Sequence, residues 1–143
     1  MPQRTESKRA RFATLKVHHM PDAPERKSQR ILVVDDDSDW RELLLDCLDE
    51  LGYATLEASN GADALECVAR DAPSVMLLDM RMPGMSGEEV LRRLPAENPP
   101  RVVVITAARA DEAGSALRTG PHYYLPKGAT REELALLLES LED

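Results

Sequence analysis

Aromatic residues are scarce in this chain. They make up 3% of its 143 residues, as one Trp, three Tyr and one Phe. Apolar residues nevertheless reach 43%, so a core must consist mainly of Leu, Val, Ala and Met. The length is that of one ordinary domain. Together these figures predict a globular unit with an aliphatic interior.

Cysteines and long apolar runs are also rare. Only Cys47 and Cys67 occur, far apart in the sequence. Because no secretory signal precedes them, they exclude a disulfide framework and favour a reducing cytoplasm. No apolar run approaches the length of a membrane span, and the N-terminus lacks the apolar core of a signal peptide. We therefore predict a cytoplasmic protein without a membrane span.

Basic residues are outnumbered, but they are concentrated at one end. The net charge of −8 argues against nucleic-acid binding by the molecule as a whole. Residues 1–30 carry eight basic and three acidic side chains, a net charge of +5, which leaves −13 for the remainder. Residues 1–29 also lack sustained apolar periodicity, so we predict a disordered basic leader there. The predicted domain is residues 30–143.

Two wholly apolar runs end in carboxylates. Residues 31–34 are followed by the acids Asp35 to Asp37, and residues 75–78 are followed by Asp79. Apolar runs of this length indicate parallel strands that are buried on both faces. After Asp79, the Pro and Gly residues of 83–87 predict a turn.

Strand and helix patterns alternate five times along the chain. This alternation predicts a parallel sheet with helices on both faces, joined by right-handed crossovers. The fold class that fits is α/β, a flavodoxin-like doubly wound sheet of five strands in the order 2-1-3-4-5 with five helices. Strands are predicted at 31–34, 53–57, 75–78, 101–105 and 122–125, and helices at 39–50, 61–72, 88–94, 109–118 and 131–141.

Two details of the helices can be predicted. The first helix has an apolar stripe, and Ser38 or Asp39 is its expected N-cap. The last helix is expected to begin with a capping box of Thr130 and Glu133. The stripe of the first helix comprises Trp40, Leu43, Leu44, Cys47, Leu48 and Leu51.

Polar residues at the strand ends converge in this topology. Asp35, Asp36, Asp79, Thr106 and Lys127 would share the carboxyl edge of the sheet, where open α/β sheets place ligands. Clustered carboxylates suit a hard cation such as Mg²⁺. A carboxylate can also attack phosphorus, and the ammonium and hydroxyl groups can contact phosphoryl oxygens. The pattern predicts a site that accepts a phosphoryl group on Asp79.

These motifs resemble one protein family, the response-regulator receiver domain of two-component signal transduction. The resemblance covers about residues 30–142. It is carried by the strand from Ile31 to Asp36, by Asp79 with the run Met82-Pro83-Gly84-Met85-Ser86-Gly87, by Thr106-Ala107, by Tyr124 and by Lys127.

The resemblance implies a role for each of these residues. Asp79 would be the phosphoacceptor, Thr106 and Lys127 would contact the phosphoryl group, and Thr106 with Tyr124 would form a conformational switch. The implied Mg²⁺ ligands are Asp35, Asp36, Asp79 and the backbone carbonyl of Arg81.

The resemblance also implies partners. A sensor histidine kinase or a histidine phosphotransfer protein would supply the phosphoryl group, and an output protein would read it. A homodimer through the face between the fourth helix and the fifth strand is possible. The chain would not be an enzyme beyond intrinsic autophosphorylation and autodephosphorylation.

Three alternatives remain open at the level of sequence. A pseudo-receiver would bind partners without ever carrying phosphate. A phosphatase of the haloacid-dehalogenase type would use Asp35 as its nucleophile. A calcium loop would use Asp35, Asp37 and Asp39, but Trp40 occupies the position where its turn needs Gly.

Overall fold

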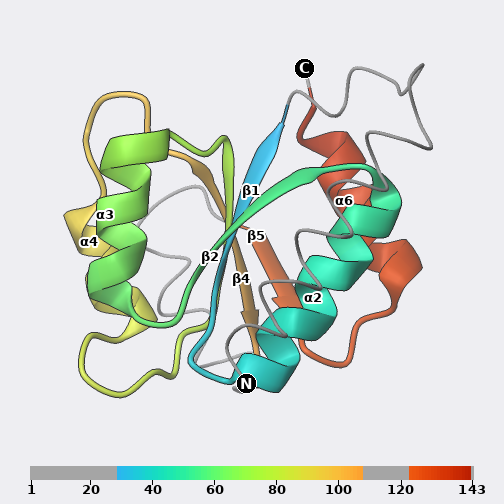
Figure 1. Cartoon of the computed structure of the whole chain (residues 1–143), viewed down its shortest axis with the longest axis horizontal. Coiled ribbons are helices and arrows are strands. Elements are labelled where there is room, and N and C mark those ends of the chain that lie inside the picture. Colours follow the sequence, from blue (N-terminus) through green and yellow to red (C-terminus); the bar gives the residue numbers. More distant parts are fainter. Residues whose placement is uncertain (1–28, 108–122, 143) are drawn as a thin grey trace, which may run out of the picture.

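The parallel sheet has the predicted strand order. The computed structural model describes residues 29–107 and 123–142, and its five strands are ordered β2-β1-β3-β4-β5, with every pair parallel (Figure 1). The sequence therefore predicted the topology correctly. The strands are β1 (Arg30–Val34), β2 (Ala54–Ala58), β3 (Val75–Leu78), β4 (Arg101–Thr106) and β5 (Tyr123–Pro126).

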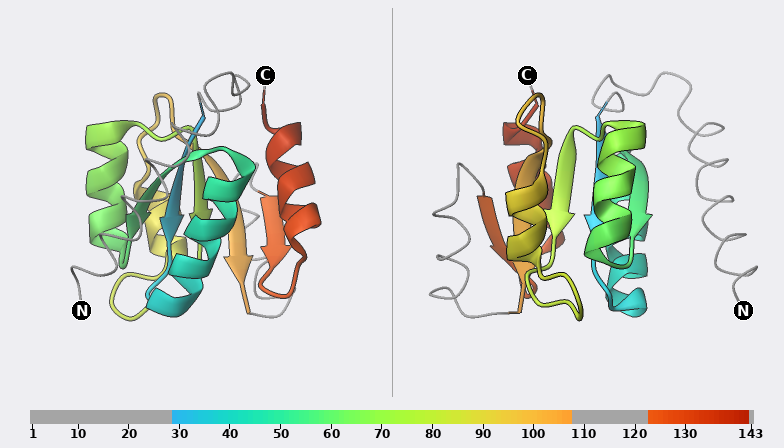
Figure 2. Two further views of the ribbon diagram at one scale, coloured as in Figure 1. Left: turned by 45° about the vertical axis from the view of Figure 1, so that its right-hand side comes forward. Right: turned by 90° about the vertical axis from the view of Figure 1, so that its left-hand side faces the viewer.

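Helices cover both faces of the sheet. One face is covered by α2 (Ser38–Leu51) and α6 (Arg131–Ser140), and the opposite face by α3 (Gly61–Asp71) and α4 (Gly87–Arg93) (Figures 1 and 2). Each face has its own apolar cluster, so the sheet separates two halves of the core. These four helices lie within the described ranges, whereas the helix predicted at 109–118 falls outside them.

The central strands bring the acidic residues together. Strand β1 pairs with β3 in a register that sets Ile31 opposite Val75 and Val34 opposite Leu78. The side chains of both strands are buried from residue 31 to 34 and from 75 to 78, as the apolar runs predicted. Each strand then ends in an acid, so this register places Asp35 beside Asp79.

The start of α2 differs from the prediction. Asp37 is the N-cap, and its carboxylate accepts hydrogen bonds from the backbone N–H groups of Asp39 and Trp40 at 3.0 and 3.3 Å. Ser38 is already helical, so the choice of Ser38 or Asp39 was wrong. Asp37 takes the role because its backbone is still extended where the chain leaves β1.

The capping box of α6 is confirmed. The Thr130 hydroxyl accepts a hydrogen bond from the backbone N–H of Glu133, and the Glu133 carboxylate accepts one from the backbone N–H of Thr130. The reciprocal pair satisfies two N–H groups that the first turn of a helix leaves without partners.

The apolar stripe of α2 agrees with the prediction except at Leu43. Leu43 is 58% exposed, whereas Leu45 is 1% exposed and packs in the core. Leu43 instead lines the mouth of a cavity of about 290 Å³ between α2 and the segment that joins β5 to α6. Leu43 therefore does not belong to the core, and Leu45 replaces it.

No helix within residues 29–107 and 123–142 is both long and apolar enough to cross a membrane.

Candidate functional site

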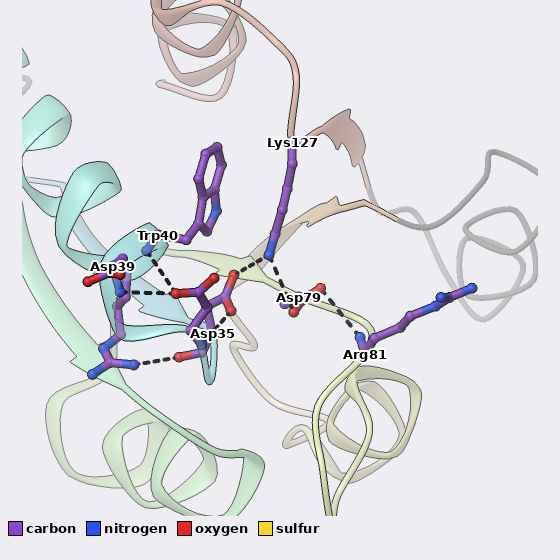
Figure 3. A network of polar contacts seen from close by, with 8 residues as sticks. Asp35, Asp39, Trp40, Asp79, Arg81 and Lys127 are labelled. Atoms are coloured by element: carbon purple, nitrogen blue, oxygen red, sulfur yellow. Dashed lines mark hydrogen bonds and ion pairs between the residues drawn. The ribbon is translucent and has the colours of Figure 1, made fainter.

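Asp79 lies at the centre of the site, directly after β3 (Figure 3). Its backbone N–H donates to the carbonyl of Val34 at 3.0 Å, which continues the β1–β3 ladder by one residue. Its carboxylate accepts a hydrogen bond of 3.4 Å from the backbone N–H of Arg81. With only 5% of its surface exposed, Asp79 is a buried carboxyl group at the end of a central strand.

Asp35 is the second buried acid of the site, at 2% exposure. One carboxylate oxygen accepts a hydrogen bond from the backbone N–H of Asp37 at 3.0 Å. Asp36 is exposed, yet one carboxylate oxygen each from Asp35, Asp36 and Asp79 lie within 4.8 Å of one another. The predicted acidic residues are thus brought together.

Lys127 reaches this cluster from the loop after β5. Its ammonium nitrogen lies 3.0 Å from Asp35 and 3.7 Å from Asp79 (Figure 3). The same nitrogen lies 5.4 Å from the centre of the Trp40 ring, within range of a cation–π interaction. The backbone N–H of Lys127 donates to the carbonyl of Thr106 at 3.2 Å, which fixes the start of the loop.

The electrostatics of the site disfavour ionisation of the Asp79 carboxyl. Burial raises the pKa of Asp79, and the negative charge of Asp35 raises it further. The Lys127 charge and hydrogen bonds from the Arg81 backbone and from Thr106 lower this pKa but do not cancel the rise. A cation at the cluster would stabilise the ionised carboxylates.

Lys127 is held in its charged form. Burial alone would lower the pKa of Lys127, but its hydrogen bond with Asp35 and the charges of Asp79 and Asp35 raise it above the ordinary lysine value. The ammonium is therefore available to contact a phosphoryl oxygen.

Thr106 and Tyr124 lie on the same face of the sheet. Thr106 ends β4 and is 1% exposed, and Tyr124 on β5 pairs with Val104. Because side chains two residues apart on a strand share a face, Thr106, Val104 and Tyr124 all project to one side. Tyr124 is half-buried against the apolar cluster of the α3–α4 face.

The start of α4 approaches the site closely at Gly87. A Cβ atom on Gly87 would lie 2.6 Å from the carbonyl oxygen of Asp79 and 2.8 Å from the Cα of Met80. Backbone atoms cannot yield at such distances, so the position requires Gly. Ser86 caps α4 by accepting a hydrogen bond from the backbone N–H of Glu89 at 3.2 Å.

Two contributors escaped the sequence analysis. The first is Arg41 in the first turn of α2, whose guanidinium donates a hydrogen bond of 2.7 Å to the backbone carbonyl of Asp35. The second is Glu57, whose carboxylate accepts a hydrogen bond of 2.9 Å from the same guanidinium. Neither residue belongs to a motif that carried the prediction. A signal existed, since Arg41 is the one basic residue in the acidic first half of α2.

The residues of the cluster fit a divalent cation of the hard class. The side chains there that could bind a metal are three carboxylates, and two of these, Asp35 and Asp79, belong to buried residues. Oxygen-only sites of this kind suit Mg²⁺, which keeps several of its waters and binds few protein ligands.

A doubly wound parallel sheet with an acidic cluster and a lysine at its carboxyl edge defines a class of signalling domain. Residues 31–139 match the family described as "Response regulator receiver domain". The match spans most of the chain, and the chain belongs to this family.

Known relatives and structures agree with this family. The response regulator MprA of Mycobacterium leprae is 40% identical over 114 residues, which are 78% of this chain and 50% of that protein. Sporulation initiation phosphotransferase F of Bacillus subtilis is 41% identical over 81 residues, 56% of this chain and 65% of that protein. The response regulator TrrA of Thermotoga maritima, solved in complex with Mg²⁺-BeF, is 32% identical with a TM-score of 0.70, and the match covers 80% of this chain and 99% of TrrA.

The chain is thus a receiver domain of two-component signalling, and receiver domains are a family of signalling modules. It spans about half the length of the curated MprA proteins that it matches.

Proposed function

We propose that this domain accepts a phosphoryl group on Asp79 and signals through protein–protein contacts. The observation that carries the proposal is the position of the Asp79 carboxylate, buried at a strand end within 4.8 Å of the Asp35 and Asp36 oxygens and 3.7 Å from the Lys127 ammonium. This arrangement gives one oxygen nucleophile, a cation site and a fixed positive charge in one place.

The residues divide the chemistry among themselves. A carboxylate oxygen of Asp79 forms a bond to phosphorus while the bond to the donor breaks, and the donor leaves with that electron pair. Asp35, Asp36, Asp79 and the backbone carbonyl of Arg81 would hold Mg²⁺, which offsets charge on the phosphoryl oxygens when bound. Lys127 and Thr106 would contact those oxygens.

The switch residues connect the site to the surface. Thr106 is buried, and its side chain is hydrogen-bonded to Asp79. Tyr124 lies on the same face of the sheet, opposite Val104, which is two residues before Thr106. We propose that Thr106 moves toward the phosphoryl group and that Tyr124 turns inward. Two packings that differ by a small local change can act as a two-state switch.

The partners are proposed at the level of class. A sensor histidine kinase or histidine phosphotransfer protein would supply the phosphoryl group, and an output protein would bind the phosphorylated state. The homodimer face proposed between the fourth helix and the fifth strand involves residues 109–118, which lie outside the described ranges. Autophosphorylation from a small donor and autodephosphorylation would be the only intrinsic reactions.

Intact mass spectrometry tests the proposal. Wild type, Asp79→Asn and the control Asp63→Asn, which removes an exposed carboxylate of α3, would be incubated with Mg²⁺ and acetyl phosphate. We expect one phosphoryl addition that hydroxylamine removes in wild type and in Asp63→Asn, and none in Asp79→Asn.

Two outcomes would contradict the proposal. An adduct that survives Asp79→Asn would point to Asp35 and the phosphatase alternative. No adduct in wild type, together with partner binding that Asp79→Asn leaves unchanged, would identify a pseudo-receiver.

A further inference from the structure

Arg41 links three elements beneath the acidic cluster. Its side chain is 16% exposed and extends from the first turn of α2. The guanidinium Nη1 donates to the carbonyl of Asp35 at the end of β1, and Nε donates to the Glu57 carboxylate on β2. One rigid, planar group therefore ties α2 to the ends of two strands.

The backbone that Arg41 holds is the one that carries the cluster. Asp35 is bonded at four atoms: its N–H to Ala58 at 3.2 Å, its carbonyl to Arg41 at 2.7 Å, and its two carboxylate oxygens to Asp37 and Lys127, each at 3.0 Å. The backbone N–H of Arg41 also donates to the carbonyl of Asp37 at 2.9 Å. Arg41 thus contacts both ends of the segment 35–37, with Asp36 between them.

The choice of acceptor matters for an ion. An arginine bonded to the carboxylates of Asp35 or Asp36 would compete with a cation for the same oxygens. Arg41 instead bonds the carbonyl of Asp35 and is paired with Glu57. Arg41 therefore occupies neither carboxylate, while it holds the backbone that orients them.

We propose that Arg41 is a positioning residue for Mg²⁺, because it fixes the backbone of residues 35–37 so that the Asp35 and Asp36 carboxylates face the ion. The inference rests on the Mg²⁺ site of the proposed function. Residues that orient metal ligands without touching the metal commonly change its affinity by about 10-fold or more when replaced.

Simple Coulomb attraction predicts the opposite sign. Removal of a positive charge near an acidic cluster lowers the repulsion on an incoming cation, so it strengthens Mg²⁺ binding. A positioning role predicts weaker binding after the same change. The direction of the effect therefore separates the two explanations.

The experiment measures the dissociation constant of Mg²⁺ by isothermal titration calorimetry on folded protein. The variants are Arg41→Met, the charge-preserving Arg41→Lys and the control Arg93→Met. Arg93 is a suitable control because its exposed guanidinium pairs with Glu89 on α4, at 2.7 Å. We expect binding about 10-fold weaker in Arg41→Met, a smaller loss in Arg41→Lys, and the wild-type value in Arg93→Met.

The outcomes are distinguishable. Wild-type or tighter Mg²⁺ binding by Arg41→Met overturns the inference and leaves the proposed function standing, whereas failure of wild type to bind Mg²⁺ overturns the proposed site itself. Urea unfolding of each variant reports stability separately, since a merely structural role would lower the free energy of unfolding without changing the affinity of the folded protein. If Arg41→Met does not fold, Arg41→Lys decides: unchanged affinity overturns the inference, and weaker binding at constant charge supports it.

Discussion

At the residue scale, the ionised Asp79 carboxylate lies in an electrostatically unfavourable environment. It is buried and faces Asp35. The Lys127 ammonium, which partly offsets its negative charge, lies 3.7 Å from Asp79 but 3.0 Å from Asp35. In the absence of a cation, the ionised form of Asp79 therefore works against the folded state. A carboxyl group whose pKa is raised in this way is a candidate functional group, which agrees with the proposed role of Asp79.

A stability measurement can detect this cost. Because folding raises the pKa of Asp79 above its ordinary value of 3.8, the folded protein binds this proton more tightly than the unfolded chain does. The contribution of this group to the free energy of unfolding falls as pH rises from about the ordinary value through the raised pKa. We expect Asp79→Asn to raise the urea midpoint of metal-free protein at pH 7 and to raise it less at pH 4.

The matched control is Glu66→Gln, which removes one exposed carboxylate of α3. It is expected to shift the urea midpoint little at either pH. A midpoint for Asp79→Asn at pH 7 that equals or falls below that of wild type would show that Asp79 is not destabilising when ionised.

The residues that sequence reasoning found and missed differ in one physical respect. The positions found from the sequence lie at strand ends, and parallel strands bring these ends to one edge of the sheet independently of side-chain conformation. They are Asp35, Asp79, Thr106 and Lys127. Arg41 reaches Asp35 through its own rotamer and through the position of α2 over the sheet. Neither quantity can be read from residue spacing.

At the element scale, the start of α2 and one position of its buried face were predicted only to within one or two residues, whereas the cap of α6 was predicted correctly. Four consecutive residues, Asp36 to Asp39, all favour an N-cap, and the position where β1 stops pairing with β3 makes Asp37 the cap. Successive residues of a helix differ by about 100° in direction, so an error of one or two residues exchanges a core position for an exposed one. Leu43 and Leu45 show this effect.

The β3–α4 loop offers a test at this scale. We expect Gly87→Ala to lower the free energy of unfolding by roughly 1–3 kcal/mol, the usual cost of forcing extra atoms into a packed site. The new Cβ would press against the backbone of Asp79 and Met80. Urea unfolding measures the loss, and a shift of the loop should also reduce the yield of the phosphoryl adduct.

Gly128 supplies the control for this substitution. A Cβ atom at Gly128 would meet nothing within 4 Å. We expect Gly128→Ala to stay within about 0.5 kcal/mol of wild type, as surface changes usually do. Equal losses for the two variants would mean that close approach is not what requires Gly87.

At the scale of the whole molecule, ion binding should appear as stability. A ligand that binds only the folded state, at about ten times its dissociation constant, adds roughly 1.4 kcal/mol to the free energy of unfolding. For a domain of this size that corresponds to a rise of roughly 5 °C in the melting temperature. We expect Mg²⁺ to produce such a rise in wild type and none in Asp36→Asn.

The control for this measurement is Asp63→Asn, which should respond to Mg²⁺ as wild type does. A rise of the same size in Asp36→Asn would place the stabilising ion elsewhere on the acidic surface. Differential scanning calorimetry with and without a chelator provides the data.

The two outer strands of the sheet have a consequence for handling the protein in concentrated solution. Open strand edges can recruit further chains and begin fibrils, and proteins resist this with short edge strands and with proline. Strand β5 has four residues and ends in Pro126, which has no backbone N–H to offer, and β2 has five. These short edges offer few unpaired backbone groups to which a further chain could add. We therefore expect concentrated samples to be stored for long periods without amyloid-type aggregation.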